Sequence, residues 1–305
     1  NPDYERAAEW DRKAASKGLS YALSNLGNLY FNGFLDNGQH NFKNAQKWYR
    51  KAASEGLSNA MFNLGSLYDN GHIGRVNGQP NYKNAQKWYQ KAASKGLSCP
   101  MFHLGSLYDN GHIGGVNGQP NYEKAAKWYQ MAADKSHSGA MIKLGTLYLN
   151  GYIEKENGSP NCDEAAKWFQ MAANKGHVGA MLNLGQLYKV GLIGIQNGKP
   201  NYDKAKEWFQ MSADKDYPHA MNALACMYAQ GCIEKVNGNP NYEKAVKWFQ
   251  KATDKGDSNA MFNLGYLYEE GHVESINNKP NYQKAQKWYK MAADKGNSHA
   301  MNALA

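Results

Sequence analysis

The chain has 305 residues, of which 42% are hydrophobic, 20% charged and 12% aromatic, and its formal net charge is +9. This aromatic content argues against a disordered chain, and no apolar run approaches the ~18 residues that a membrane-spanning helix needs. The basic balance fits an anionic partner, but it fits a solvated basic face repeated along the chain equally well.

The sequence repeats itself with a period of about 40 residues. The eight tryptophans occupy one position of the repeat: Trp10, Trp48, Trp88, Trp128, Trp168, Trp208, Trp248 and Trp288. A leucine series (Leu26, Leu64, Leu104 and onward) and a tyrosine series (Tyr30, Tyr68, Tyr108 and onward) follow the same period. This period is typical of solenoids, propellers and other repeat arrays.

The second repeat contains a helical pattern over residues 58–70. Ala60, Met61, Leu64, Leu67 and Tyr68 follow the spacing of three and four that places side chains on one helix face. Gly71 ends this helix, and the following loop carries an Asn77-Gly78 pair that predicts a tight turn.

A helix over residues 81–96 follows the loop. Asn81 is a good N-cap, and Gly96 is a plausible C-terminal stop. The apolar positions Tyr82, Ala85, Tyr89, Ala92 and Ala93 again share one face. The chain lacks runs of alternating β-branched residues, which argues against a propeller. We therefore predict an all-α solenoid of about seven and a half helix-turn-helix repeats of 40 residues.

The strings Asn-Tyr-x-Lys-Ala-x-Lys-Trp-Tyr-x-x-Ala-Ala-x-x-Gly and Ala-Met-x-x-Leu-Gly-x-Leu-Tyr-x-x-Gly resemble the two helices of the Sel1-like repeat, a relative of the tetratricopeptide repeat. The resemblance covers essentially the whole chain and implies a right-handed α-solenoid. We expect a single array over 1–305, with boundaries near 1–40, 41–80, 81–120, 121–160, 161–200, 201–240, 241–280 and a partial 281–305. Two departures are a longer loop from Gly71 to Asn81 and the replacement of the Leu-Gly glycine by Ala225 and Ala305.

Stacking explains how such short helix pairs can fold, because neighbouring repeats share one continuous core. Small residues such as Ala85, Ala92 and Gly65 allow helix backbones to approach, and Tyr89 and Leu64 fill the remaining space. We interpret the tryptophan row as packing between adjacent repeats, and the alternative is a stacking platform for a ligand.

Lysines lie opposite the apolar face of the first helix. Lys83, Lys87, Lys91 and Lys95 are four residues apart, and similar positions recur in neighbouring repeats. We predict a solvated outer face with its charge spread along the array rather than gathered in a patch. Nucleic-acid binding through a broad surface is a less favoured alternative.

The second helix has a polar face that contains large apolar side chains. One repeat position on this face holds Phe62, Phe102, Ile142, Leu182 and Phe262, and the same position holds Ser24, Asn222 and Asn302 in other repeats. In tetratricopeptide-like folds this helix lines a concave groove, so the resemblance implies that these side chains anchor a protein or peptide. The alternative is that they pack against neighbouring helices.

Two further positions of this face vary more than the core does. One holds Ser66, Ser106, Thr146, Gln186, Cys226 and Tyr266, and the other holds Asp69, Asp109, Leu149, Lys189, Ala229 and Glu269. Different chemistry along one surface suits an extended peptide or a protein surface better than a single small molecule.

No catalytic, cofactor or metal constellation is evident, so we predict a protein that is not an enzyme. His72, His112 and His272 share a loop position, and equivalent positions of stacked repeats are too far apart to share a metal. The four cysteines occupy no common repeat position, which argues against a disulfide framework and favours a reducing compartment. The single glycosylation triplet at 157–159 is expected by chance.

The leading hypothesis is an adaptor or scaffold that binds another protein in its groove. The last repeat stops at Ala305 within its second helix, and solenoids need polar capping repeats. A structural protein that assembles head-to-tail into a filament is therefore an alternative. A third possibility is an array that regulates a domain elsewhere in a larger protein. The sequence does not identify the partner or the compartment, although the cysteine usage weakly favours the cytoplasm.

Overall fold

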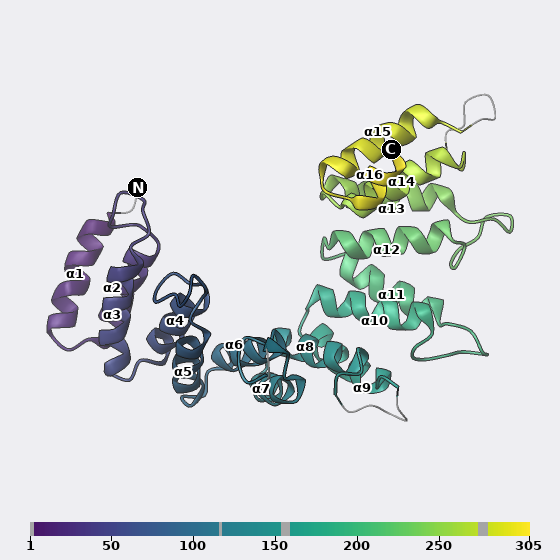
Figure 1. The fold of residues 1–305 in the computed structure, drawn as a ribbon. Helices are drawn as coiled ribbons and strands as arrows, with labels where there is room; N and C mark the ends of the chain where they lie inside the picture. Colours follow the sequence, from purple (N-terminus) through teal and green to yellow (C-terminus); the bar gives the residue numbers. More distant parts are fainter. Residues whose placement is uncertain (1–2, 116–117, 154–158, 274–279) are drawn as a thin grey trace. The chain divides into compact units, whose positions relative to one another are not determined.

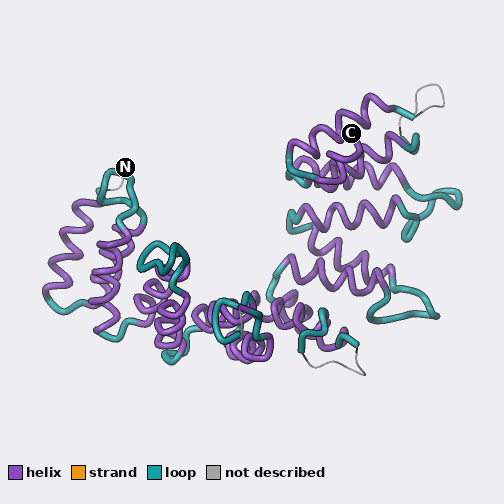
Figure 2. Tube along the Cα trace, viewed as in Figure 1, coloured by secondary structure: helices purple, strands orange, loops and turns teal. Residues whose placement is uncertain are grey.

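The computed structural model describes residues 3–115, 118–153, 159–273 and 280–305, which form helix pairs (Figures 1 and 2). The chain divides into two compact units, Asn1–Pro160 and Asn161–Ala305. Unit 1 contains α1 (Tyr4–Ser16), α2 (Ser20–Phe31), α3 (Phe42–Ser54), α4 (Ser58–Asp69), α5 (Tyr82–Ala93), α6 (Ser98–Asp109), α7 (Tyr122–Asp134) and α8 (Ser138–Leu149). Unit 2 contains α9 (Cys162–Asn174), α10 (Val178–Val190), α11 (Tyr202–Ala213), α12 (Pro218–Ala229), α13 (Tyr242–Asp254), α14 (Ser258–Glu269), α15 (Tyr282–Asp294) and α16 (Ser298–Ala303).

The prediction of an all-α array of helix pairs is confirmed. The described residues form sixteen helices, and the β-type pairing among them consists of isolated bridges in loops. These helices form eight pairs, and the second helix of the last pair, α16, is short. This agrees with the expected number of about seven and a half repeats. Among the described residues, none of the helices combines the length and the apolar character needed to cross a membrane. Asn157 and Gly158 of the glycosylation triplet lie outside the described residues.

Asparagine caps begin the first helices of the repeats, as predicted for Asn81. Its side-chain oxygen accepts a hydrogen bond from the backbone N–H of Asn84 at 3.0 Å, which satisfies one of the free donors at the helix start. The other asparagines at this repeat position make the same contact: Asn41, Asn121, Asn161, Asn201, Asn241 and Asn281.

The core lies between the helices of neighbouring pairs. Ala85, Ala92, Leu64 and Tyr89 have no exposed surface. A Cβ atom on Gly65 would lie 2.5 Å from two ring carbons of Tyr89, so glycine is what allows the ring to rest on the α4 backbone. This close approach confirms the role that the sequence indicated for the small residues.

The loop after α4 contains a very tight turn. Asn77 and Gly78 have φ values of 49° and 77°, and Val76 and Gln79 exchange both backbone hydrogen bonds at 3.0 Å. This is the geometry of a two-residue hairpin turn, for which Asn-Gly is the preferred pair. The prediction from the Asn-Gly pair is therefore confirmed.

Candidate functional site

In unit 1, the predicted anchors lie on equivalent positions of consecutive second helices. Phe62 on α4, Phe102 on α6 and Ile142 on α8 are each half-buried. Phe62 contacts the His103 ring with centroids 5.3 Å apart, and Phe102 stacks on His137 at 4.7 Å with an interplanar angle of 18°. Each ring therefore packs on a neighbouring repeat and still retains an exposed surface, and its role as an anchor for a partner stays a prediction.

The predicted serine and aspartate positions are fixed by tyrosines of the next first helix. The Tyr89 hydroxyl donates to Asp69 Oδ2 at 3.0 Å and lies 3.4 Å from Ser66 Oγ. The same arrangement recurs one repeat later, where Tyr129 donates to Asp109 at 3.0 Å and to Ser106 at 3.2 Å. Burial, followed by the Asp69 charge, raises the pKa of Tyr89, so this hydroxyl stays protonated and remains a donor.

The structure adds one position that sequence reasoning missed, the residue directly after the apolar anchor. Lys143 Nζ lies 3.1 Å from Asp109 Oδ2, and His103 Nδ1 lies 3.9 Å from Asp69 Oδ2. Each side chain therefore reaches back to the carboxylate of the preceding repeat. The signal was present in the sequence, since this position holds Asn63, His103, Lys143 and Asn183 between otherwise constant core residues.

One of the predicted positions uses its polar group within its own helix. The Thr146 hydroxyl donates to the Ile142 carbonyl at 2.9 Å within α8, so its polar group is already satisfied. The unit 1 face therefore consists of half-buried aromatic rings, two carboxylates, and the His103 and Lys143 side chains. Such a surface offers apolar contacts and charged hydrogen-bonding groups together.

In unit 2 the same positions carry different chemistry. Leu182, Asn222 and Phe262 are half-buried, while Gln186 and Tyr266 are exposed. Asn263 donates to Asn222 Oδ1 at 2.9 Å, so Asn222 takes part in a polar link between α12 and α14. The apolar row predicted from the sequence is interrupted here.

A pocket of about 320 Å³ opens beside this polar link in unit 2. Its walls come from α12, α13, α14 and the adjoining loops: Cys226, Ala229, Gln230, Tyr242, Phe249, Asn263, Tyr266, Leu267 and His272. Tyr242 and His272 stack with centroids 4.3 Å apart. Burial raises the pKa of the Cys226 thiol to about 11, so it remains a neutral wall group and not a thiolate nucleophile.

The shared loop histidines have a structural role. His112 stacks on Tyr82 with centroids 3.9 Å apart, and His72 stacks on Phe42 at 4.0 Å. Within the ranges that the structure describes, no group of three or more His, Cys, Asp or Glu side chains could hold a metal ion. The four cysteines are free thiols.

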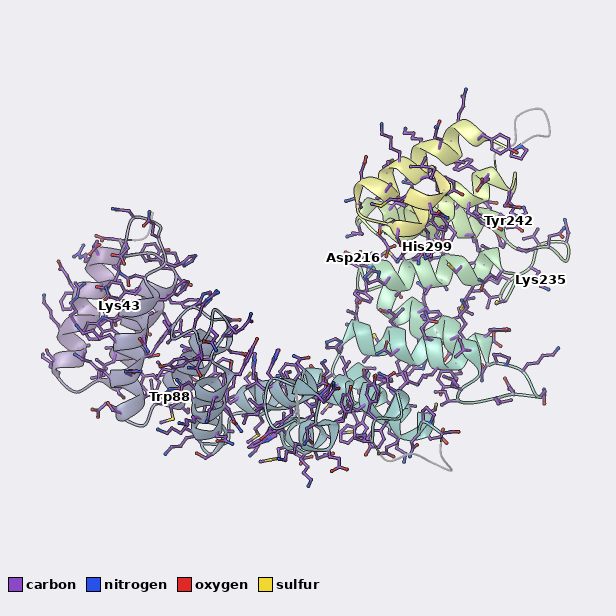
Figure 3. The ribbon with its side chains drawn as sticks, in the orientation of Figure 1. Lys43, Trp88, Asp216, Lys235, Tyr242 and His299 are labelled. Atoms are coloured by element: carbon purple, nitrogen blue, oxygen red, sulfur yellow. The ribbon has the colours of Figure 1, made fainter. Side chains whose placement is uncertain are left out.

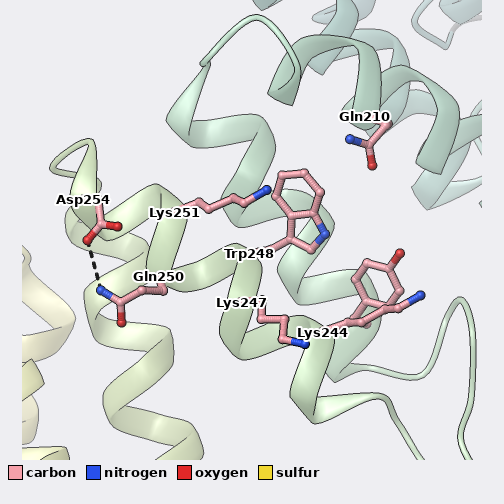
Figure 4. A pocket seen from close by; sticks show the side chains of 8 residues that line it. Gln210, Lys244, Lys247, Trp248, Gln250, Lys251 and Asp254 are labelled. Carbon is pink, nitrogen blue, oxygen red and sulfur yellow. Dashed lines mark hydrogen bonds between the residues drawn. The ribbon is translucent and has the colours of Figure 1, made fainter.

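A larger opening, of about 580 Å³, surrounds Trp248 on the outward side of α13 (Figure 4). Lys251 Nζ lies 4.1 Å from the centroid of the Trp248 ring, and Gln250 donates to Asp254 at 3.0 Å. The tryptophan row is therefore half-buried in this part of the chain, with one side of the ring in the core and the other beside lysine.

Comparison with known proteins agrees with this architecture. The Sel1 repeat matches residues 1–19, 20–57, 58–97, 101–137, 138–177, 178–217, 218–257 and 258–297. The chain belongs to the Sel1 repeat family. No curated protein sequence matches it.

Two solved structures are similar in both sequence and fold. One is c5321, described as a protective antigen present in uropathogenic Escherichia coli strains that displays an SLR fold, with 29% identity and a TM-score of 0.72 over 97% of this chain. This chain spans 58% of the length of c5321. The other is a Sel1 repeat protein from Oxalobacter formigenes, with 30% identity and a TM-score of 0.59, covering 83% of this chain and 96% of that one.

Yeast Tom70 shares the fold alone, with 14% identity and a TM-score of 0.53 over 100% of this chain and 60% of that one. Sel1 repeat proteins are typically non-catalytic scaffolds for protein–protein interactions. Seven of the eight matched Sel1 segments, such as 58–97, join a second helix to the following first helix, whereas 1–19 contains α1 alone. That pairing contains both the Gly65–Tyr89 contact and the Tyr89–Asp69 hydrogen bond.

Proposed function

We propose that this Sel1 repeat chain is a non-catalytic adaptor that binds a peptide or protein surface along the face of its second helices. The observation that carries the proposal is the unit 1 face, where half-buried Phe62 and Phe102 lie beside Asp69, Asp109 and Lys143. Aromatic anchors surrounded by charged groups are typical of interface hot spots.

The unit 2 pocket supplies a second kind of contact. Its opening of about 320 Å³ beside the exposed Tyr266 accommodates one apolar side chain, and Asn263 and Gln230 offer polar groups at its rim. Unit 1 would therefore contact a partner through aromatic rings and charged groups, and unit 2 through its pocket. This suits an extended segment better than a compact small molecule.

Selection of peptides on the intact chain tests this proposal. Peptides from a random display library would be selected on the wild-type protein, and the affinity of each would be measured for Phe102→Ser and Phe262→Ser. Loss of a hot-spot ring costs ~2 kcal/mol or more, which weakens binding at least about thirtyfold. The Met131→Ser variant is a matched control, because Met131 is 45% exposed on a first helix.

Selected peptides that bind both serine variants as tightly as wild type would contradict the second-helix face as the binding site. Circular dichroism of each variant separates lost folding from lost binding. Sedimentation over a concentration series addresses the alternative of end-to-end assembly. Growth into long species would favour self-association, while a monomer at all concentrations would leave the adaptor as the better explanation.

A further inference from the structure

The positive charge of the chain is concentrated in two consecutive repeats. Residues 41–120, the second and third repeats, contain nine Lys and Arg residues and three acidic residues, so they carry +6 of the net charge of +9. The even spread expected from the repeated lysines is therefore wrong. The difference arises because most other repeats place more acidic residues among their lysines, whereas the partial repeat 281–305 has four lysines and one acidic residue.

The cations of these repeats form one outward-facing surface on α3 and α5. Its lysines are four residues apart on each helix and all are exposed: Lys43, Lys47 and Lys51 on α3, and Lys83, Lys87 and Lys91 on α5. The opposite sides of both helices are buried in one core cluster, which includes Ala45 and Ala52 of α3 and Ala92 of α5. Figure 3 labels Lys43 and Trp88 on these two helices.

No carboxylate of the described residues lies within ion-pair distance of these six lysines. Unit 2 is different, because Glu234 pairs with Lys206 and Lys244, and Glu243 pairs with Lys247. The positions equivalent to these two glutamates are Gly74 in the second repeat and Lys83 in the third. Like charges four residues apart destabilise a helix slightly, so this arrangement has a cost that a bound anion would relieve.

Tryptophan rings lie between the lysines of this surface. Trp48 and Trp88 are half-buried, and Lys51 Nζ and Lys91 Nζ lie 4.8 and 4.6 Å from the respective ring centroids. A pocket of about 430 Å³ is lined by Lys87, Trp88, Gln90, Lys91 and Ser94. An apolar wall among ammonium groups accommodates an apolar side chain that is flanked by carboxylates.

We propose that this surface, the basic tryptophan face of α3 and α5, docks an acidic segment of a partner protein. Its Asp or Glu side chains would lie over the six lysines, and one apolar side chain would fill the pocket at Trp88. The face belongs to the first helices, so this inference is independent of the adaptor function proposed for the second helices.

The chemistry favours an acidic protein segment over nucleic acid. Recognition of bases relies on arginine forks and on open aromatic faces for stacking. The one arginine of α3, Arg50, donates to the Tyr68 hydroxyl at 3.0 Å, and each tryptophan ring already carries a lysine on one face. Lysine ammonium groups are instead point charges that pair with separate carboxylates.

Fluorescence anisotropy with the full chain tests the proposal. The probe is a labelled peptide of glutamates with a leucine at every fourth position, and labelled poly-Glu, oligo(dT) and vesicles containing phosphatidylserine are compared with it. The face variant carries Lys43→Gln, Lys47→Gln, Lys87→Gln and Lys91→Gln. The control variant carries Lys199→Gln, Lys215→Gln, Lys235→Gln and Lys290→Gln, which removes the same charge from exposed lysines of unit 2.

We expect the glutamate–leucine peptide to bind wild type and the control alike, to weaken about tenfold or more with the face variant, and to weaken as ionic strength rises. The Trp88→Leu variant should lose affinity for this peptide but not for poly-Glu. Equal losses with the face and control variants would overturn the proposal, as would no peptide binding at low salt. Tighter binding of oligo(dT) or vesicles through the same lysines would show that the occupant is not an acidic protein segment.

Discussion

The Tyr89 hydroxyl donates a hydrogen bond to the Asp69 carboxylate at 3.0 Å, which joins α5 to the preceding second helix on the candidate binding face. In later repeats, the residue at the Tyr89 position varies together with the residue at the Asp69 position. An acidic residue at the Asp69 position is followed by Tyr89, Tyr129 or Tyr289, whereas Leu149, Lys189 and Ala229 are followed by Phe169, Phe209 and Phe249. Tyr49, which follows Phe31, is the exception, and its hydroxyl donates to Asn28 Oδ1 at 2.7 Å. The hydroxyl is therefore kept where the preceding second helix offers an acceptor, since a buried donor without a partner is costly.

We predict that Tyr89→Phe lowers the free energy of unfolding by about 1 kcal/mol, because Asp69 loses a donor but remains partly exposed to water. The same change in an Asp69→Ala background should cost much less, since that pair reproduces Ala229 and Phe249. Urea unfolding of the four proteins of this double-mutant cycle measures the coupling. A coupling energy near zero would mean that the hydrogen bond does not stabilise the fold.

Replacement of the glycine beneath the same ring should cost more. A Cβ atom in Gly65→Ala would lie 2.5 Å from Tyr89 ring carbons, and overpacking of this kind destabilises by about 1–3 kcal/mol in spite of alanine's better helix propensity. Gly179→Ala is a matched helical control, because its Cβ would meet only the His177 ring at 3.4 Å and beyond. Thermal or urea unfolding should therefore show a loss for the first variant and little change or a gain for the second.

The sequence predicted the helices well because their signals are local. Asn81 and the Asn77-Gly78 turn each act through their own backbone or the next turn of chain, and the structure confirms both. Repetition strengthens these signals, since each pattern recurs in neighbouring units.

The candidate site was harder to predict because its properties depend on pairs of repeats. His103 and Lys143 were missed because their partners, Asp69 and Asp109, lie in the preceding repeat. The pocket in unit 2 is likewise lined by residues of different repeats, such as Cys226 and Tyr266. The net charge of the whole chain also conceals the local excess of lysines on α3 and α5. Acidic residues in other repeats offset the lysines there and keep the average charge per residue moderate.

The asparagine cap of α5 should contribute measurably to stability. Asn81→Ala removes the acceptor for the Asn84 N–H and also the donor that reaches the Gly74 carbonyl at 3.1 Å, so we expect a loss of about 1 kcal/mol. Asn81→Asp restores the helix cap but not the donor to Gly74. The difference between these two variants in urea unfolding separates the cap from the loop contact, and equal losses would show that the cap contributes nothing.

Unit 1 should lose stability on mild acidification because of His103. Burial lowers the pKa of this side chain below its usual 6.5, and the nearby Asp69 only partly opposes the shift, while His137 adds to it. Protons then bind the unfolded chain at a higher pH than the folded one, so stability is present above about pH 6.5 and declines as pH falls toward the folded pKa. Below that value the folded protein is also protonated, and the decline stops.

The variant His103→Asn tests this explanation, since asparagine stands at the equivalent positions Asn63, Asn183 and Asn263. We expect the urea midpoint of wild type to fall between pH 7.5 and 5.5, and that of His103→Asn to fall less. His112→Asn is the control, because that exposed histidine stacks on Tyr82 in a loop and is not part of the face. If His103→Asn keeps the full pH dependence of wild type, the acid sensitivity arises elsewhere. His137 is then the next candidate: burial also lowers its pKa, and its ring accepts a hydrogen bond from the Ala140 N–H at 3.2 Å that protonation would remove.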